Sequence, residues 1–297
     1  MSFIFILVAS YVLQSTSSAR ILGVFPYVAK SHFVMAEQLM LGLAARGHEV
    51  VVISHFPQKK AVPNYTDISL VGSMPAFVSA VPLDAVATGR IQTVISLLAH
   101  LGVSGCEQTL SFPEVQKFIH SNEKFDLVIN EAFNSDCYAP FAYKFNVPLV
   151  SISATPLLPW CYARLGAPDN PAYVGNIFLE YSDRMTFAER LINTFVYVLT
   201  HWEYHFLFDL PSQAIVRKYF GESTPDLAEI VKNTSLILVN RHFSINQPIP
   251  NLPNVIEVGG IHVTKPKKLS QVREPYLINA KICKVFRKVM TSITNIH

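Results

Sequence analysis

The stretch that decides the fold runs from Arg20 to Ser54 and reads RILGVFPYVAKSHFVMAEQLMLGLAARGHEVVVIS. It begins with a short apolar run, RILGVF, which is typical of a buried parallel strand. From Ser31 onward apolar residues recur at helical spacing, and Gly47 stands where a helix C-terminus favours glycine. A second apolar run, EVVVIS, follows at residues 49–54. The stretch therefore predicts two parallel strands joined by a helix in a right-handed crossover.

The loop between this first strand and its helix contains one histidine, His32. It has neither a G-x-G-x-x-G motif nor a G-K-[ST] motif, so it lacks the glycines with which such loops hold a phosphate. Ser31 is the expected N-cap, which puts His32 in the first helical turn. There the helix dipole disfavours the imidazolium form, and a neutral imidazole is what a general base needs near neutral pH. The alternative is a structural or solvated histidine, which is also our interpretation of His48 and His55.

The rest of the chain continues to alternate strands and helices, which predicts an α/β fold with a doubly wound parallel sheet. Further strands are expected at residues 67–72, 125–130, 148–153, 235–240 and 254–260, and helices at 91–101, 112–120, 136–144 and 185–210. An aromatic stripe on the last helix is expected to pack in the core. A pocket wall and a membrane-surface contact are the alternatives. The stripe consists of Phe195, Tyr197, Trp202, Tyr204, Phe206 and Phe208.

Composition excludes several classes of protein. The 297 residues are 50% hydrophobic and 15% charged, which fits one large globular domain or two small ones. A net charge of +3, dispersed along the chain, does not indicate a nucleic-acid partner. The four cysteines have no C-x-x-C spacing and indicate no metal site, and their pairing cannot be read from the spacing alone.

The first residues are expected to be a targeting segment. The apolar run from Phe3 to Leu13 is followed by small residues up to Ala19, which is typical of a secretory signal peptide spanning residues 1–19. Two sequons, at Asn64 and Asn233, are candidate N-glycosylation sites. We therefore expect the mature chain in the secretory pathway, in the lumen or at the membrane of the endoplasmic reticulum, or secreted if it is truly truncated.

Two carboxylates are expected at the same edge of the sheet as His32. Glu131 directly follows the strand at 125–130, and Asp136 stands at the expected start of the next helix, where an N-cap is the alternative explanation. A carboxylate beside the first loop would accept the Nδ1–H of His32, fix its tautomer and stabilise the imidazolium formed on proton transfer. The residues themselves do not decide between the two.

Taken in order, the segments of this chain resemble the UDP-glycosyltransferases, the inverting family-1 enzymes, and in particular their insect or arthropod branch. The resemblance covers about Arg20 to Val263. It is carried by the opening stretch from Ile21 to Ser54 and by FDLVINEAFNSDC, FNVPLVSISA, PAYVG, DRMTFAERLINT and LILVNRHFSINQPIPNLPNVIEVGGIHV.

The resemblance implies a GT-B architecture, in which residues 20–263 form a Rossmann-like acceptor-binding domain and a second domain binds the UDP-sugar. It implies transfer of a hexosyl group, with inversion, to a hydroxyl of a small lipophilic acceptor. The UDP-sugar is a co-substrate, and no cofactor is expected. His32 would be the general base and Glu131 or Asp136 its orienting partner. Ser31, Phe33 and Trp160 are expected to contact the acceptor, in a pocket walled by the helix at 185–210 together with PLLPW.

The chain also departs from the family pattern. It lacks the His-Gly-Gly motif of the donor-binding domain, and after Pro266 the sequence no longer matches the family pattern. We therefore expect an N-terminal half that lacks the donor domain, with residues 264–297 as a linker and divergent tail. The alternative function is a catalytically inactive isoform that binds hydrophobic small molecules or associates with a full-length subunit, as a homo- or heterodimer. An unrelated nucleotide-binding protein would need a phosphate loop, which the sequence lacks.

Overall fold

The computed structural model describes residues 18–74, 91–166 and 169–264, and all structural statements below concern these residues. Almost all of them belong to one compact unit that ends at His262. The expected signal peptide, apart from its last two residues, and the expected tail from residue 265 lie outside the described part, so both stay predictions. Within that part, no helix has the length and apolar character needed to span a bilayer.

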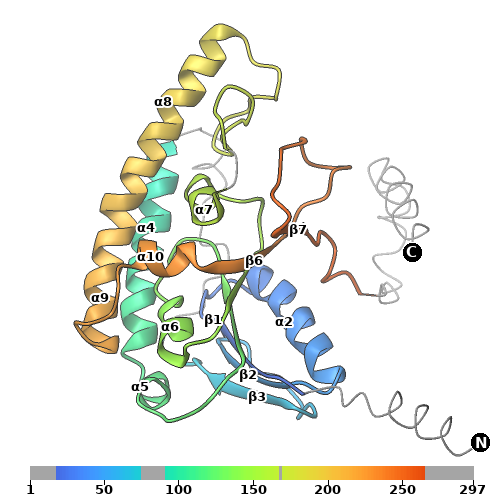
Figure 1. The fold of residues 1–297 in the computed structure, drawn as a ribbon, viewed down its shortest axis with the longest axis vertical. Coiled ribbons are helices and arrows are strands. Elements are labelled where there is room, and N and C mark those ends of the chain that lie inside the picture. The colour runs from blue at the N-terminus through green and yellow to red at the C-terminus, as the bar shows by residue number, and fades with distance from the viewer. Residues whose placement is uncertain (1–17, 75–90, 167–168, 265–297) are drawn as a thin grey trace, which may run out of the picture. The chain divides into compact units, whose positions relative to one another are not determined.

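The centre of this unit is a parallel sheet of seven strands in the order β3-β2-β1-β4-β5-β6-β7 (Figure 1). The parallel sheet predicted from the sequence is thus confirmed. Because β1 pairs with β2 on one side and with β4 on the other, the strand order reverses between β1 and β4. The strands are β1 Arg20–Phe25, β2 Glu49–Ser54, β3 Tyr65–Ser69, β4 Leu127–Glu131, β5 Leu149–Ser153, β6 Thr234–Val239 and β7 Val255–Glu257.

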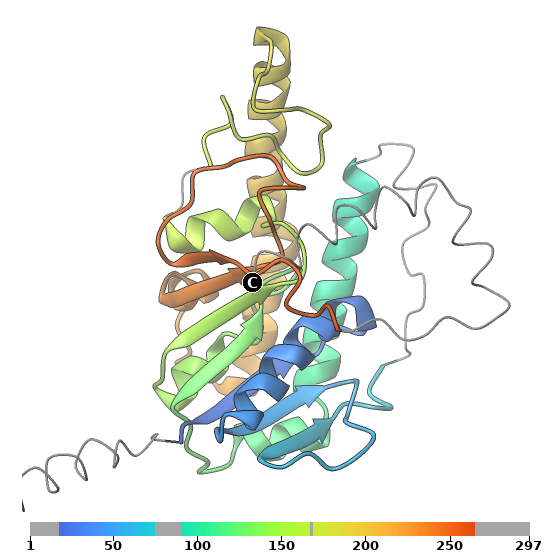
Figure 2. The ribbon, with the colours of Figure 1, turned by 90° about the vertical axis from the view of Figure 1, so that its right-hand side faces the viewer.

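Helices cover both faces of the sheet, as Figure 2 shows for α2 on one face and α4, α8 and α9 on the other. Alternate residues of β1 serve the two faces: Ile21 and Phe25 pack with α2, whereas Leu22 and Val24 pack with the opposite layer. The helices are α2 Lys30–Ala45, α4 Ile91–Leu110, α5 Pro113–Ile119, α6 Pro140–Phe145, α7 Pro159–Tyr162, α8 Phe187–Tyr204, α9 Leu210–Phe220 and α10 Leu227–Lys232.

Two expected helix starts are wrong. The first helix begins at Lys30 with Ala29 as its N-cap, so Ser31 lies exposed inside the first turn and makes no capping bond. The expected helix at 136–144 begins only at Pro140, because proline favours the first turn of a helix. Asp136 therefore lies in the preceding loop and is not an N-cap. The expected helix end is confirmed, since Gly47 has φ +90° directly after the C-cap.

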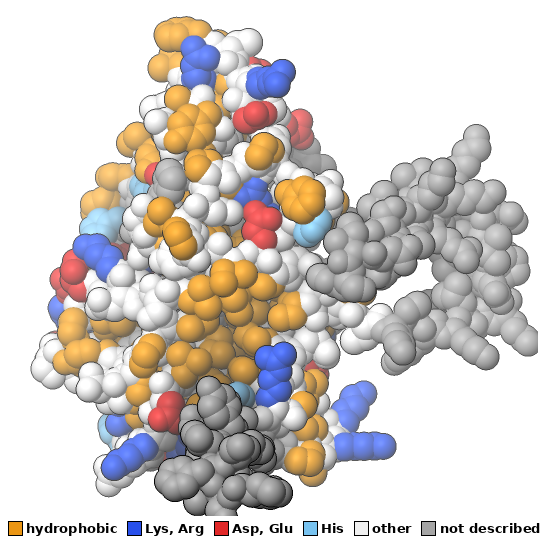
Figure 3. Space-filling view, turned by 45° about the vertical axis from the view of Figure 1, so that its right-hand side comes forward, with side chains coloured by type: hydrophobic (Ala, Val, Ile, Leu, Met, Phe, Trp, Pro, Cys, Tyr) orange, Lys and Arg blue, Asp and Glu red, His pale blue; other side chains and the backbone are white. Residues whose placement is uncertain are grey.

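The aromatic helix is longer and more exposed than expected. A π-helical turn, His205–Asp209, joins α8 to α9. Pro211 lacks the N–H needed for a regular helical bond at this junction. Phe208 is buried at 1% exposure, but Phe195 and Trp202 are 67% and 60% exposed, so core packing is the wrong interpretation for the outer half of the stripe. In Figure 3 apolar side chains follow the upper left outline of the molecule, where α8 lies.

Candidate active site

The candidate site lies where the strand order reverses. His32 stands in the first turn of α2, just after β1, and Glu131 is the last residue of the neighbouring strand β4. The connections that leave these two strands diverge, and open α/β sheets bind ligands in the crevice formed at such a point. Nδ1 of His32 lies 2.5 Å from Oε1 of Glu131, and both side chains are largely buried. Of the two carboxylates considered, Glu131 is therefore the one that contacts the histidine.

Two aromatic rings hold the imidazole of His32 in place. The ring centroids of Tyr27 and Phe133 lie 4.6 and 4.4 Å from that of the histidine. Burial, with a further contribution from the charge of Glu131, raises the pKa of Tyr27 to about 12, so its phenol is neutral beside the pair. With Nδ1–H donated to the carboxylate, Nε2 is the free nitrogen of the ring. Among the described residues Nε2 has no hydrogen-bond partner, so this nitrogen is the one left to accept a proton.

A cavity of about 420 Å³ is lined by Glu131 and by Tyr27 and Phe133, the two rings that flank His32, whereas His32 itself is not among its lining residues. It lies between α4 and the loops that follow β1 and β4, with Glu131 at its edge. Such an apolar wall with a few polar groups is typical of small-molecule pockets. The wall that we expected from the helix at 185–210 is therefore provided by α4. The apolar lining comes from Tyr27, Val28, Leu97, Leu101, Phe133 and Tyr138, and the polar lining includes Ser104, Gln108 and Asn134.

Asp136, the second candidate partner, has a different role in the structure. Its Oδ1 lies 2.5 Å from Nη2 of Arg164, and the hydroxyl of Tyr204 donates to its Oδ2 at 2.6 Å. Burial lowers the pKa of Arg164, but Asp136, Cys161 and Tyr204 together raise it above its ordinary value, so the guanidinium stays charged. This buried network ties the loop after β4 to the 3₁₀ turn Ala163–Leu165 that follows α7 and to α8. Spacing along the chain does not reveal it, because its three members are distant in sequence.

The three expected acceptor contacts do not line the cavity. Phe33, on the buried side of α2, is 2% exposed and stacks on Phe56. Trp160 is 4% exposed, donates its Nε1–H to the carbonyl of Phe133 at 2.8 Å and stacks on Tyr204. Ser31 points away into solvent. Sequence reasoning instead missed Tyr27 and Phe133, although each lies close in sequence to a residue of the proposed pair.

A disulfide and a close helix contact fix the wall of the cavity. Cys106 of α4 pairs with Cys137 in the loop after β4, while Cys161 is free and buried. Any side chain on Gly102 would collide with the carbonyl of Asn134, so glycine allows α4 to approach this loop closely. The structure thus shows a disulfide pairing that could not be predicted from the spacing of the cysteines.

A model of the UDP-glucoronosyl and UDP-glucosyl transferases matches residues 20–281. The chain belongs to the UDP-glycosyltransferase family. The match begins at Arg20, as expected, and extends past Val263, where we expected the resemblance to end. Over 273 residues the chain is 40% identical to UDP-glucosyltransferase 2 of Dactylopius coccus, with 87% of this chain and 50% of that protein covered. It is 34% identical over 287 residues to UDP-glycosyltransferase UGT5 of the same species, with 93% and 54% covered.

The UDP-glycosyltransferase chain thus spans about half the length of the curated relatives it matches. Among solved structures, Arabidopsis thaliana UGT89C1 complexed with quercetin aligns with 89% of this chain and 56% of that one, at 13% identity and a TM-score of 0.43. The family is shown by the sequence matches and not by this likeness.

Proposed function

We propose that this chain is the acceptor-binding half of a UDP-glycosyltransferase that transfers a hexosyl group to a hydroxyl of a small lipophilic acceptor with inversion. The observation that carries the proposal is the pair of His32 and Glu131, 2.5 Å apart, with Glu131 at the edge of an apolar cavity of about 420 Å³. Base, orienting carboxylate and acceptor pocket are together in one place, as general-base activation of a hydroxyl requires.

In the proposed reaction, the acceptor lies in this cavity with its hydroxyl against Nε2 of His32. Nε2 takes the hydroxyl proton as the oxygen forms its bond to the anomeric carbon of the sugar. The bond from that carbon to the diphosphate oxygen breaks on the opposite face, and UDP leaves with the electron pair. Glu131 holds the imidazole in its reactive tautomer and stabilises the imidazolium. Names of relatives, such as UDP-glucosyltransferase 2, support a glucosyl donor. We assign no described residue to UDP.

A second candidate function is binding without catalysis. The cavity is lined entirely by residues of this chain, and the chain spans half the length of its relatives. In this case the chain binds hydrophobic small molecules, or pairs with a full-length subunit, and transfers no sugar itself. The two functions differ in one result, which is whether a bound phenol is also glycosylated when this chain is joined to a donor-binding half.

The proposed location is the secretory pathway. The pairing of Cys106 with Cys137 supports it, because structural disulfides persist in oxidising compartments. Both sequon asparagines, Asn64 and Asn233, are exposed and within reach of a glycosylating enzyme. Expression in secretory cells should give a mature N-terminus near Arg20. An N-terminus at Met1 in such cells would contradict this location.

We also propose that the outer face of α8 lies against a membrane surface. Between Arg190 and Asp209 the only Asp, Glu, Lys or Arg is Glu203, which is buried, so the exposed face is free of these charges and rich in aromatic side chains. The measurement is flotation with phosphatidylcholine vesicles. Trp202→Glu, at a 60% exposed position, should abolish flotation while the fold persists. Equal flotation of this variant and the parent chain would contradict the contact.

The proposed transfer is tested in a chimera that joins this chain to the donor-binding half of UDP-glucosyltransferase 2 of Dactylopius coccus. With UDP-glucose and 4-nitrophenol we expect the β-glucoside, since the donor carries an α linkage and inversion reverses it. Proton NMR of the product identifies the anomer through its coupling constant. A folded chimera that binds both substrates but yields no glucoside, or yields the α-anomer, would refute the proposal.

A further inference from the structure

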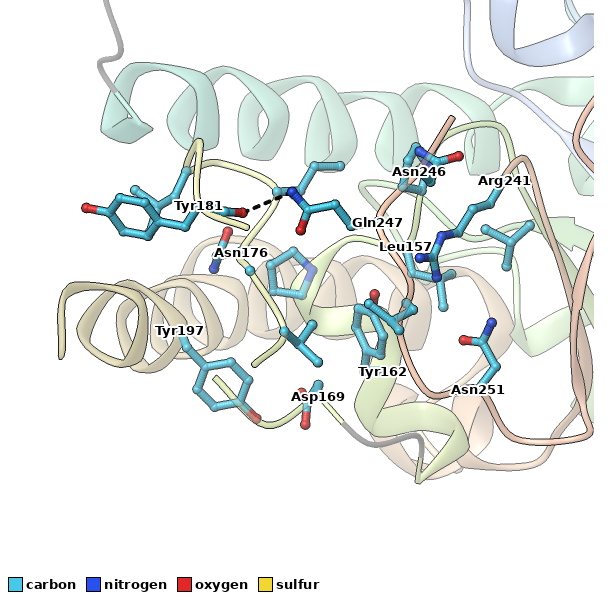
Figure 4. A pocket seen from close by; sticks show the side chains of 18 of the residues that line it. Leu157, Tyr162, Asp169, Asn176, Tyr181, Tyr197, Arg241, Asn246, Gln247 and Asn251 are labelled. Atoms are coloured by element: carbon cyan, nitrogen blue, oxygen red, sulfur yellow. Dashed lines mark hydrogen bonds between the residues drawn. The ribbon is translucent and has the colours of Figure 1, made fainter. Parts of the chain in front are cut away.

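A second cavity, of about 250 Å³, lies away from the His32 pocket. It is formed by the segments after β5 and β6, the start of β7 and the inner side of α8. Figure 4 shows Arg241, Tyr162, Asp169 and Asn176 grouped around this hollow. None of its lining residues belongs to the cavity beside Glu131, so the two are distinct sites. Its volume lies below the roughly 300–1,000 Å³ of drug-sized pockets, which favours a ligand of about one ring.

The unusual feature of this cavity is a set of buried donors without partners. Arg241 is 5% exposed, yet its guanidinium forms no hydrogen bond with any described residue. Its closest charged neighbour is Glu257, with Nη1 3.5 Å from Oε1, which is an ion contact and no hydrogen bond. The amide Nδ2 of Asn176, a residue 7% exposed, is also unpaired. Buried donors of this kind are costly unless something accepts from them.

Charge limits what that partner can be. The cavity contains one guanidinium, Arg241, and two carboxylates, Asp169 and Glu257. An anionic ligand would meet two negative charges against one positive charge, and a cationic ligand has no acceptor for the free donors of Arg241 and Asn176. A purely apolar ligand would leave the donors unpaired. A neutral ligand rich in oxygen satisfies the donors without adding charge.

The lining also fits the shape of such a ligand. Tyr162 and Tyr197 present aromatic rings beside Leu157 and Ile249, which provide apolar surface for the C–H face of a ring. The carboxylates of Asp169 and Glu257 can accept from hydroxyl groups. Burial raises the pKa of Tyr162 to about 12 against the opposing charge of Arg241, so its phenol stays neutral and able to donate.

We propose that this second cavity binds the sugar ring of a neutral glycoside. Arg241 and Asn176 donate to its oxygens, Asp169 and Glu257 accept from its hydroxyls, and the tyrosine rings lie along its apolar face. The site is separate from the transfer chemistry proposed for His32, and it needs neither UDP nor a donor domain. It gives the protein a place to hold a sugar that is not being transferred, such as the glycosyl part of an acceptor or a product.

The test uses the full chain and methyl β-glucopyranoside as the probe, with saturation-transfer NMR and calorimetry. We expect saturable binding of the glucoside. Methyl β-glucuronide, in which a carboxylate replaces the C6 hydroxymethyl group, should bind at least tenfold more weakly. Methoxycyclohexane, which has a six-membered ring without the ring oxygen and the hydroxyls, should not bind. No saturable binding of the glucoside, or equal binding of the glucuronide, would overturn the proposal.

Variants locate the site. Arg241→Lys keeps the positive charge beside Glu257 but loses the planar guanidinium with its several N–H donors. This variant should weaken binding of the glucoside by about tenfold or more. Tyr162→Phe keeps the packing and removes one hydroxyl, for a loss of roughly threefold to tenfold. His100→Ala, at an exposed position that lines the other cavity, is the matched control and should leave binding unchanged. Circular dichroism confirms folding of each variant. Unchanged binding in both Arg241→Lys and Tyr162→Phe, or a loss in His100→Ala alone, would overturn the assignment.

Discussion

The buried pair of Asp136 and Arg164 predicts a large stability cost for Asp136→Asn. The side chains are 6% and 2% exposed, and two further nitrogens of Arg164 already have no partner among the described residues. Asparagine keeps the size and one acceptor but removes the charge, which leaves the guanidinium buried without its counter-ion. Breaking a buried pair in this way costs about 3–5 kcal/mol, which is a large share of the roughly 5–15 kcal/mol that stabilises a typical domain.

The assay is urea unfolding of the chain followed by far-UV circular dichroism. Asp226→Asn is the matched control, because Asp226 also pairs with an arginine, Arg217, but with 68% of its side chain exposed. Exposed pairs contribute only about 0–1 kcal/mol, so the control should lose little. Glu131→Gln should also lose far less free energy of unfolding than Asp136→Asn, because its partner His32 can be neutral. Equal unfolding free energies for Asp136→Asn and Asp226→Asn would refute the structural role of Asp136.

Three further predictions concern the covalent and ionisable groups. Replacing Cys106 and Cys137 together by alanine should lower the unfolding free energy by about 2–4 kcal/mol in urea, and an unchanged midpoint would contradict the disulfide. Burial raises the pKa of Asp209 in the folded chain, although its contact with His205 opposes this. At a pH above this raised pKa the ionised carboxylate therefore destabilises the fold, and the destabilisation disappears as the pH falls below the ordinary pKa of an aspartate. Asp209→Asn should therefore stabilise the chain in urea near pH 7 but not near pH 3, and the opposite order would be evidence against this. If both sequons are glycosylated in secretory cells, the double variant Asn64→Gln and Asn233→Gln should lose no mass on treatment with an N-glycosidase. A mass loss in the double variant would contradict these sites.

The strands could be predicted from the sequence because a buried parallel strand leaves a local signal. Ile21–Phe25 and Val50–Ile53 contain no charged or polar side chain, and the structure has the strands Arg20–Phe25 and Glu49–Ser54 with the predicted bounds. Helix starts were less well predicted, because a capping residue such as Ser31 is only a weak preference and α2 begins one residue earlier without a side-chain cap. The start of α6 at Pro140 follows the preference of proline for the first helical turn.

The partner of His32 needed the structure. The sequence left both Glu131 and Asp136 open as the partner, and only the contacts separate them: Glu131 reaches the imidazole, whereas Asp136 pairs with Arg164. The exposed aromatic residues were misread for a related reason. Helical spacing shows that Phe195 and Trp202 share a face, but it does not show whether that face turns inward. Buried Asn193 and Glu203 on the opposite side show that here it turns outward.

The role of His32 as general base is tested by the turnover of His32→Ala. In the chimera with a donor-binding half, single-turnover transfer from saturating UDP-glucose to 4-nitrophenol measures the chemical step. We expect a loss of roughly 10²–10⁴ in that rate for His32→Ala, with donor affinity nearly unchanged. Glu131→Gln should lose part of the rate, and Asp136→Asn, corrected for its folded fraction, little. A His32→Ala chimera that transfers glucose at the parent rate would show that His32 is not the general base.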